Sequence, residues 1–209
     1  MAIRTAVNRA LTAITALPTA AALANGNLTL LTTATASSSA TLDFTSSIDS
    51  TYDSYVFKFY NIHPSANGNT KFTFNMSIDA GSNYNVTKTS TFYVAYNKED
   101  DGEAVLAYDT GYDLAQSTDF QEITSGVGGA VADENACGTL QIFNPSSTTF
   151  VKHFICSSNS YRGDFVGSFF QNIAGYANTT SAVDAIRFQF STGNIDSGVI
   201  KLYGVGPKQ

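Results

Sequence analysis

The amino-acid sequence predicts an all-β protein, a jelly-roll-like β-sandwich preceded by a short N-terminal helical arm. Three observations support this. Polar and apolar residues alternate in segments such as Tyr55–Ser77, as expected for strands with one buried face. Clusters of Gly, Asn, Ser and Asp separate such segments at spacings of roughly 10 to 20 residues, which is typical of sandwiches. Only 13% of the residues are charged and 43% are hydrophobic, which suits a packed core beneath a neutral β surface.

Residues 1–39 are expected to form an anchoring arm and linker, and residues 40–209 the sandwich. The arm has an apolar face at helical spacing, and Pro18 ends the helix. A helix at a chain end has little core of its own to cover, so we expect it to dock on a neighbouring subunit. The anchoring residues predicted on this face are Ile3, Val7, Leu11, Ile14 and Leu17.

A secretory signal peptide is the alternative for the same segment. Residues 1–24 contain two arginines, a mostly apolar stretch and a final Ala-Leu-Ala, which are the parts of such a signal. Thr12, Thr15 and Pro18 interrupt the apolar stretch, and this favours the anchoring arm.

The strands are predicted from the alternation that follows the arm. The Thr- and Ser-rich residues 28–39 are expected to be an extended linker. Residues 97–136 are poorly periodic, so we expect loops at one end of the sandwich, where β scaffolds carry most binding functions. The predicted strands span residues 40–44, 55–62, 71–78, 90–96, 139–143, 151–157, 165–177, 185–191 and 199–205, with a weaker candidate at 120–124.

Charge and motifs argue against several classes of function. The net charge is −6, the pI is about 4.7 and no basic stripe is present, so we expect no nucleic-acid partner, because phosphate binding draws on clustered Lys and Arg. No apolar run reaches about 18 residues, so no membrane insertion is expected. Gly126–Gly129 lacks the Lys and Ser/Thr of a phosphate loop and is expected to be a flexible loop. We therefore expect neither an enzyme nor a bound cofactor.

The candidate metal ligands have ordinary explanations. Residues 97–103, "NKEDDGE", concentrate carboxylates but do not match the spacing of a calcium loop, so a solvated turn is expected. His63, His153 and Cys156 could in principle share a metal, but nothing in their spacing demands it, and no metal site is expected. Cys137 and Cys156 could form a disulfide, and two small buried thiols are the favoured alternative.

Tyrosines in the predicted loops are the candidate contact residues. Tyrosine offers a large contact area at low entropic cost and is therefore common at interfaces. Tyr108, Tyr112 and Tyr161 are the candidates for contact with a partner or receptor. The alternative, of equal weight, is that these side chains close the ends of the core.

Three segments carry a resemblance to a known family. They are "ATLDFTSSIDSTYDSYVFKFYNIHPSANGNTKFTFNMS", "TLQIFNPSSTTFVKHF" and "FSTGNIDSGVIKLYGV". They resemble virion structural and tail fibre-like proteins of marine bacteriophages, especially those that infect cyanobacteria. The likeness covers residues 28–205, and the ending around "IKLYG" is its most specific part. The N-terminal arm is not part of it, and no fibre shaft is present.

This resemblance implies a structural protein on the virion surface. The expected role is that of a tail fibre-type protein, attached through its N-terminal arm to other tail or capsid subunits and used in host attachment. A host surface glycan or receptor is the expected outer partner, and a homotrimer the expected assembly. A capsid decoration or cement protein that stabilises the head is the first alternative. A secreted carbohydrate-binding module, with residues 1–24 as its signal, is the second.

Overall fold

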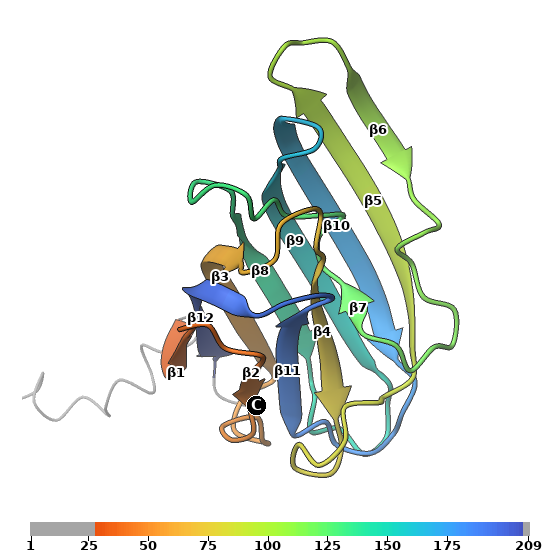
Figure 1. Cartoon of the computed structure of the whole chain (residues 1–209). Coiled ribbons are helices and arrows are strands. Elements are labelled where there is room, and N and C mark those ends of the chain that lie inside the picture. The colour runs from red at the N-terminus through yellow and green to blue at the C-terminus, as the bar shows by residue number, and fades with distance from the viewer. Residues whose placement is uncertain (1–27, 207–209) are drawn as a thin grey trace, which may run out of the picture.

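The computed structural model describes residues 28–206, and within them the protein is all-β, with two antiparallel sheets and no helix (Figure 1). This agrees with a β-sandwich. The large sheet has eight strands in the order β1-β12-β3-β8-β9-β10-β5-β6, and the small sheet has four in the order β2-β11-β4-β7. The strands are β1 (Leu28–Thr35), β2 (Leu42–Phe44), β3 (Ser54–Pro64), β4 (Phe72–Ser77), β5 (Lys88–Lys98), β6 (Ala104–Tyr108), β7 (Gln121–Glu122), β8 (Ala136–Phe143), β9 (Lys152–Arg162), β10 (Gly167–Ala177), β11 (Ala185–Phe190) and β12 (Ile195–Val205).

The prediction that residues 28–39 form a linker was wrong over most of this segment. Residues 28–35 form β1, which pairs with β12 in an antiparallel ladder that runs from Leu28 opposite Val205 to Thr35 opposite Val199. The β-branched threonines of this segment favour extended backbone, and the ladder supplies the hydrogen-bond partners that a linker would lack. Among the described residues, the sheet therefore already includes Leu28, well before residue 40. The predicted helical arm and its anchoring residues lie outside the described residues.

Most of the other predicted strands are confirmed, with shifted ends. The weak candidate at 120–124 is a strand only at Gln121–Glu122. The prediction missed β6, which lies in residues 97–136, where loops were expected. Gly126–Gly129 is not a loose loop either: Val127 is fully buried and forms a bridge with Thr70.

The core lies between the two sheets and is dominated by phenylalanine. Phe188 on β11 is its centre. Its ring centroid lies 5.3 Å from that of Phe57, 5.7 Å from Phe72, 6.0 Å from Phe44 and 6.3 Å from Phe74. All five side chains are buried, so this cluster joins both sheets through a single ring. Aromatic pairs at these separations add to the stability that burial alone provides.

A buried lysine lies at one edge of this core. Lys88 on β5 is fully buried, and its Nζ donates to Asn75 Oδ1 at 2.5 Å and to the Val86 carbonyl at 2.7 Å. Burial lowers the pKa of the Lys88 ammonium to about 7, an effect that the Asp119 carboxylate partly offsets. A neutral amine has two N–H donors for these two acceptors, so the uncharged form fits the site.

We expect the free energy of unfolding to increase by about 2 kcal/mol between pH 7 and pH 9. The pKa of Lys88 is lower in the folded state than in the unfolded state, so the unfolded chain binds more protons in this range and stability rises with pH. Urea unfolding across the range measures the effect. The rise should disappear in Lys88→Met and persist in the control Lys58→Met, a partly exposed lysine on the outer face. An equal rise in both variants would contradict this role of Lys88.

Candidate functional site

Four chain segments meet at one end of the sandwich, which we call the loop end. They are the β5–β6 turn (residues 99–103), the β9–β10 turn (residues 163–166) and the loops at 65–69 and 126–135 (Figure 1). Glu99 N donates to the Val166 carbonyl at 3.0 Å, and Gly128 N donates to the Tyr161 carbonyl at 3.2 Å. These bonds hold segments that are distant in sequence in fixed positions.

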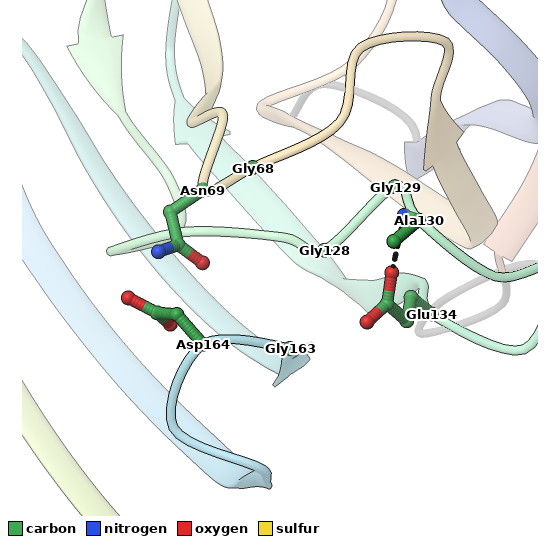
Figure 2. Close-up of a pocket in the computed structure, with 8 residues that line it drawn as sticks. All are labelled: Gly68, Asn69, Gly128, Gly129, Ala130, Glu134, Gly163 and Asp164. Carbon is green, nitrogen blue, oxygen red and sulfur yellow. Dashed lines mark hydrogen bonds between the residues drawn. The ribbon is translucent and has the colours of Figure 1, made fainter.

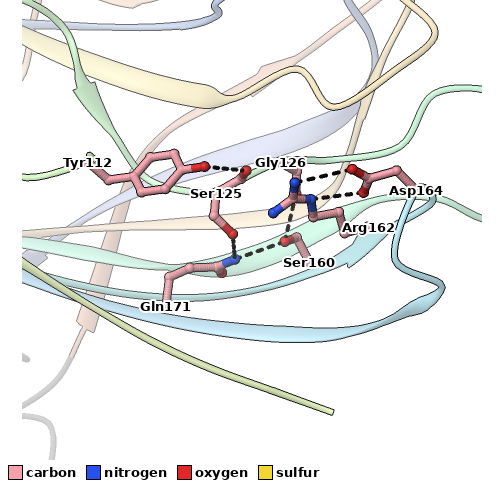
Figure 3. A network of polar contacts seen from close by, with 7 residues as sticks. All are labelled: Tyr112, Ser125, Gly126, Ser160, Arg162, Asp164 and Gln171. Carbon is pink, nitrogen blue, oxygen red and sulfur yellow. Dashed lines mark hydrogen bonds and ion pairs between the residues drawn. The ribbon is translucent and has the colours of Figure 1, made fainter. Parts of the chain in front are cut away.

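A buried polar network forms the floor of the loop end (Figure 3). The Gln171 side-chain amide on β10 lies 3.2 Å from Ser125 Oγ, 3.1 Å from Ser160 Oγ and 3.0 Å from Ser158 Oγ. Ser160 Oγ donates to the Gly126 carbonyl at 2.9 Å. Because the amide and hydroxyls are buried between the sheets, these bonds fasten residues 123–126 onto the inner face of β9 and β10.

An arginine joins this floor to the surface of the loop end. Arg162 forms two contacts with Asp164, Nε to Oδ1 at 2.9 Å and Nη2 to Oδ2 at 3.2 Å. Its guanidinium also lies over the ring of Phe165, 4.8 Å from the centroid, and 5.3 Å from that of Phe169. The bidentate ion pair with Asp164, together with stacking of the guanidinium on the two phenylalanine rings, holds both charged groups in one orientation.

An aromatic cluster extends the core along β5 and β10. The Tyr96 ring stacks on that of Phe169 with centroids 4.7 Å apart, and Phe165 packs edge-on against both. Tyr96 Oη donates to Glu103 Oε1 at 2.8 Å, and this carboxylate raises the pKa of Tyr96. Lys98 Nζ lies 4.9 Å from the centroid of Phe165. The cluster therefore places charged groups at the rim of an apolar surface.

Two of the hollows at the loop end include Asp164 in their lining. The larger is a groove of about 480 Å³ with three carboxylates at its wall; it is lined by Lys98, Glu99, Asp100, Asp164, Phe165 and Val166. The smaller has a volume of about 130 Å³ and a wall rich in glycine (Figure 2). It is lined by Gly68, Asn69, Gly128, Gly129, Ala130, Glu134, Gly163 and Asp164.

The glycines of the smaller hollow are needed for close packing against Glu134. The Glu134 side chain is only 4% exposed, and Oε2 accepts hydrogen bonds from Ala130 N at 2.6 Å and Val131 N at 3.2 Å. A methyl group at Gly128 or Gly163 would overlap the Glu134 carboxylate. Glycine at these two positions therefore leaves the room that the Glu134 carboxylate occupies.

The hydrogen-bonding groups that line these hollows indicate which ligands they can bind. Asn69 Oδ1 is buried and has no hydrogen-bond partner among the described residues, and Figure 2 shows Asn69 and Asp164 pointing toward each other across the hollow. Carboxylate and amide oxygens accept hydrogen bonds, and the neighbouring aromatic edges offer apolar contact. The combination suits a ligand with several hydroxyl groups. Within residues 28–206, no three His, Cys, Asp or Glu side chains lie close enough to hold a metal ion.

The three tyrosines predicted as contact residues do not converge on the loop end. Tyr112 is half-buried, stacks on Phe92 with centroids 5.0 Å apart and donates to the Ser125 carbonyl at 3.3 Å, so it closes the core. Tyr108 and Tyr161 were expected in loops, but they lie in β6 and β9. By register, both side chains are on the outer face of the large sheet, three strands apart.

The other candidate residues are also placed apart. Both cysteines are free thiols, as predicted, but only Cys156 is buried in the core. The prediction that Cys137 is buried was wrong, because this residue lies on the outer face of β8, where it contacts Asn61. Burial raises the pKa of the Cys156 thiol. His63 Nδ1 lies 2.5 Å from the Glu134 carbonyl, while His153 lies at the opposite end of the large sheet beside Tyr176. The turn predicted at residues 97–103 is confirmed over residues 99–103, because residues 97 and 98 still belong to β5.

No protein-family model, curated protein or solved structure matches this chain. In the part of the chain that the structure describes, no helix is both long and apolar enough to span a bilayer.

Proposed function

We propose that this protein is a structural component of a bacteriophage virion, exposed on the particle surface and without catalytic activity. Its sandwich is a jelly roll that carries two extra hairpins. It attaches to other virion proteins through its N-terminal segment, and its loop end faces outward as a tail fibre-type attachment surface. A decoration or cement protein on the capsid is the alternative location for the same architecture.

The observation that carries the proposal is the order in which the strands pair. When the β5–β6 and β9–β10 hairpins are set aside, eight strands remain. Their pairs are β1 with β12, β2 with β11, β3 with β8 and β4 with β7. The first strand thus pairs with the last, the second with the second-last, and so on, which is the pattern of one long hairpin rolled into two sheets. Jelly rolls of this kind recur in viral capsid and lectin domains.

The two extra hairpins support a role in assembly. They add β9, β10, β5 and β6 to one side of the large sheet, and nothing in residues 28–206 covers the outer face of these strands. The face carries Thr, Ser and Asn together with exposed aromatic rings, a composition that suits contact with other protein or with sugar.

The positions of the two sheet edges suggest how this protein is oriented on the particle. The first described strand, β1, forms one edge of the large sheet, and β6 forms the other. Across eight strands these edges are separated by about 33 Å. Attachment through the segment that precedes β1 would leave the loop end available for a host surface, where a glycan rich in hydroxyls is the ligand that the hollows suit.

Removal of residues 1–27 should abolish incorporation of this protein into particles, because the truncation removes the proposed anchor but leaves β1 and the sheets intact. Particles assembled with the truncated or the full chain would be purified and their content compared by quantitative mass spectrometry. Asp164→Asn, which changes only the loop end, is the control and should be incorporated normally. Full occupancy by the truncated chain would contradict anchoring. Absence of the full chain from purified particles would contradict the function itself.

A further inference from the structure

The outer edge of β6 has unpaired backbone groups. Glu103 accepts from Lys98 N and Asp109 donates to the Phe92 carbonyl, so the odd-numbered residues of this hairpin arm bond to β5. In an antiparallel ladder the alternate residues direct their N–H and C=O groups the other way. Ala104, Leu106 and Tyr108 therefore present these groups at the edge of the sheet, where no described strand pairs with them.

This edge lacks the features that usually prevent strand pairing. Edge strands are commonly protected by charged side chains, proline or a bulge, but β6 reads Ala-Val-Leu-Ala-Tyr and pairs with β5 without a bulge. Leu106 is 80% exposed. Leu106 lies opposite Ala95 of β5, and Ala95 lies opposite Phe170 of β10, which is 45% exposed. The apolar surface at the edge therefore continues across the outer face of the sheet.

We propose that β6 pairs antiparallel with β6 of a second copy of this chain, about a two-fold axis at Leu106. This register sets Leu106 opposite Leu106 of the second copy, and Ala104 opposite Tyr108. The three residues with free backbone groups then all face one another, so three pairs exchange six hydrogen bonds. The two large sheets become one continuous sheet. This inference does not depend on the proposed virion role.

The β6 sequence favours a second copy as the partner. A two-fold contact requires a self-complementary surface, and the register about Leu106 matches the smallest side chain with the largest on both sides. The same register also aligns Phe170, Ala95 and Leu106 of one copy with Leu106, Ala95 and Phe170 of the other, so they form one apolar stripe across the joined sheets. Against this, Glu103 would face Asp109 of the second copy at each end, and like charges directly opposite weaken pairing. We therefore expect a contact that strengthens with added salt.

Cysteine trapping tests both the contact and its register. In full-length protein carrying Cys137→Ser, Leu106→Cys should form a disulfide-linked dimer under mild oxidation, because directly opposite residues have Cα atoms about 5.5 Å apart. Ala104→Cys should not, because residue 104 faces residue 108, whereas the double variant Ala104→Cys, Tyr108→Cys should. Equal trapping of the two single variants, or none of Leu106→Cys, would overturn the proposal.

Light scattering during size-exclusion chromatography provides an independent readout without cysteines. The unmodified protein at high concentration should show a monomer–dimer equilibrium that shifts toward dimer as salt increases. Leu106→Lys should weaken the dimer at least about tenfold, since it removes an apolar contact and sets two like charges opposite each other. Phe150→Lys, at a 70% exposed residue away from β6, is the matched control and should leave it unchanged. A strict monomer, or a trimer insensitive to Leu106→Lys, would contradict pairing through β6.

Discussion

Replacing Phe188 with alanine should lower the free energy of unfolding by about 4 kcal/mol, the largest effect that we expect from a single substitution. Phe188 is fully buried and its ring contacts the rings of Phe44, Phe57, Phe72 and Phe74, which belong to both sheets. Truncation would remove these contacts and leave a cavity between layers that are braced by many other residues and cannot collapse fully.

Chemical unfolding in urea measures this effect, and Phe170→Ala is the matched control. Phe170 is the same residue type in a strand of the large sheet, but it is on the outer face and 45% exposed. Its truncation should cost less than about 1 kcal/mol. Similar losses in the two variants would mean that the space between the sheets is not packed as described.

Replacing Gln171 with leucine should cost about 3 kcal/mol, the second largest effect. Leucine has a similar size but cannot bond to the buried hydroxyls of Ser125, Ser158 and Ser160, and each group left unsatisfied costs about 1 to 3 kcal/mol. The hydroxyls retain some partners in backbone carbonyls, which limits the loss. The network holds residues 123–126 against β9 and β10, so their backbone amides should exchange hydrogen faster in the Gln171→Leu variant than in the unmodified protein.

Asn172→Leu is the control for this substitution. It makes the same change of a polar side chain to leucine at the next residue of β10, whose side chain points to the outer face. It should leave both the stability and the exchange at residues 123–126 nearly unchanged. If Gln171→Leu were as mild as the control, the network would be incidental to the position of that segment.

Strands with one well-buried face could be predicted from the sequence, and strands without such a face could not. In β3 and β4, large apolar residues repeat at every second position because they fill the core, and this alternation gave nearly correct ends. Neither β1 nor β6 contains a buried residue, so neither shows a clear pattern of this kind. Both are edge strands, held by one ladder of backbone bonds that leaves little trace in the side chains.

The loop end illustrates why long-range contacts escape sequence analysis. The residues between the predicted strands 151–157 and 165–177 were expected to form a turn, but residues 158–162 continue β9 and the turn begins only at Gly163. Nothing local indicates that Arg162 stacks on Phe169 or that Glu134 packs against Gly163. The sequence does contain one signal of the buried network. Gln171 and Ser160 occupy positions of their strands that the alternation assigns to the core, and polar residues in that phase predict a buried hydrogen-bonded network.

Electron microscopy of intact particles at a resolution that places individual strands would test the central claim most directly. The proposal predicts density for this sandwich on the particle surface, with the β1 edge toward a neighbouring virion protein and the loop end toward solvent. Density around the tail would favour host attachment, and density at capsid symmetry axes would favour a cement role. Particles with no density for this chain, or with the loop end buried against the shell, would contradict the account.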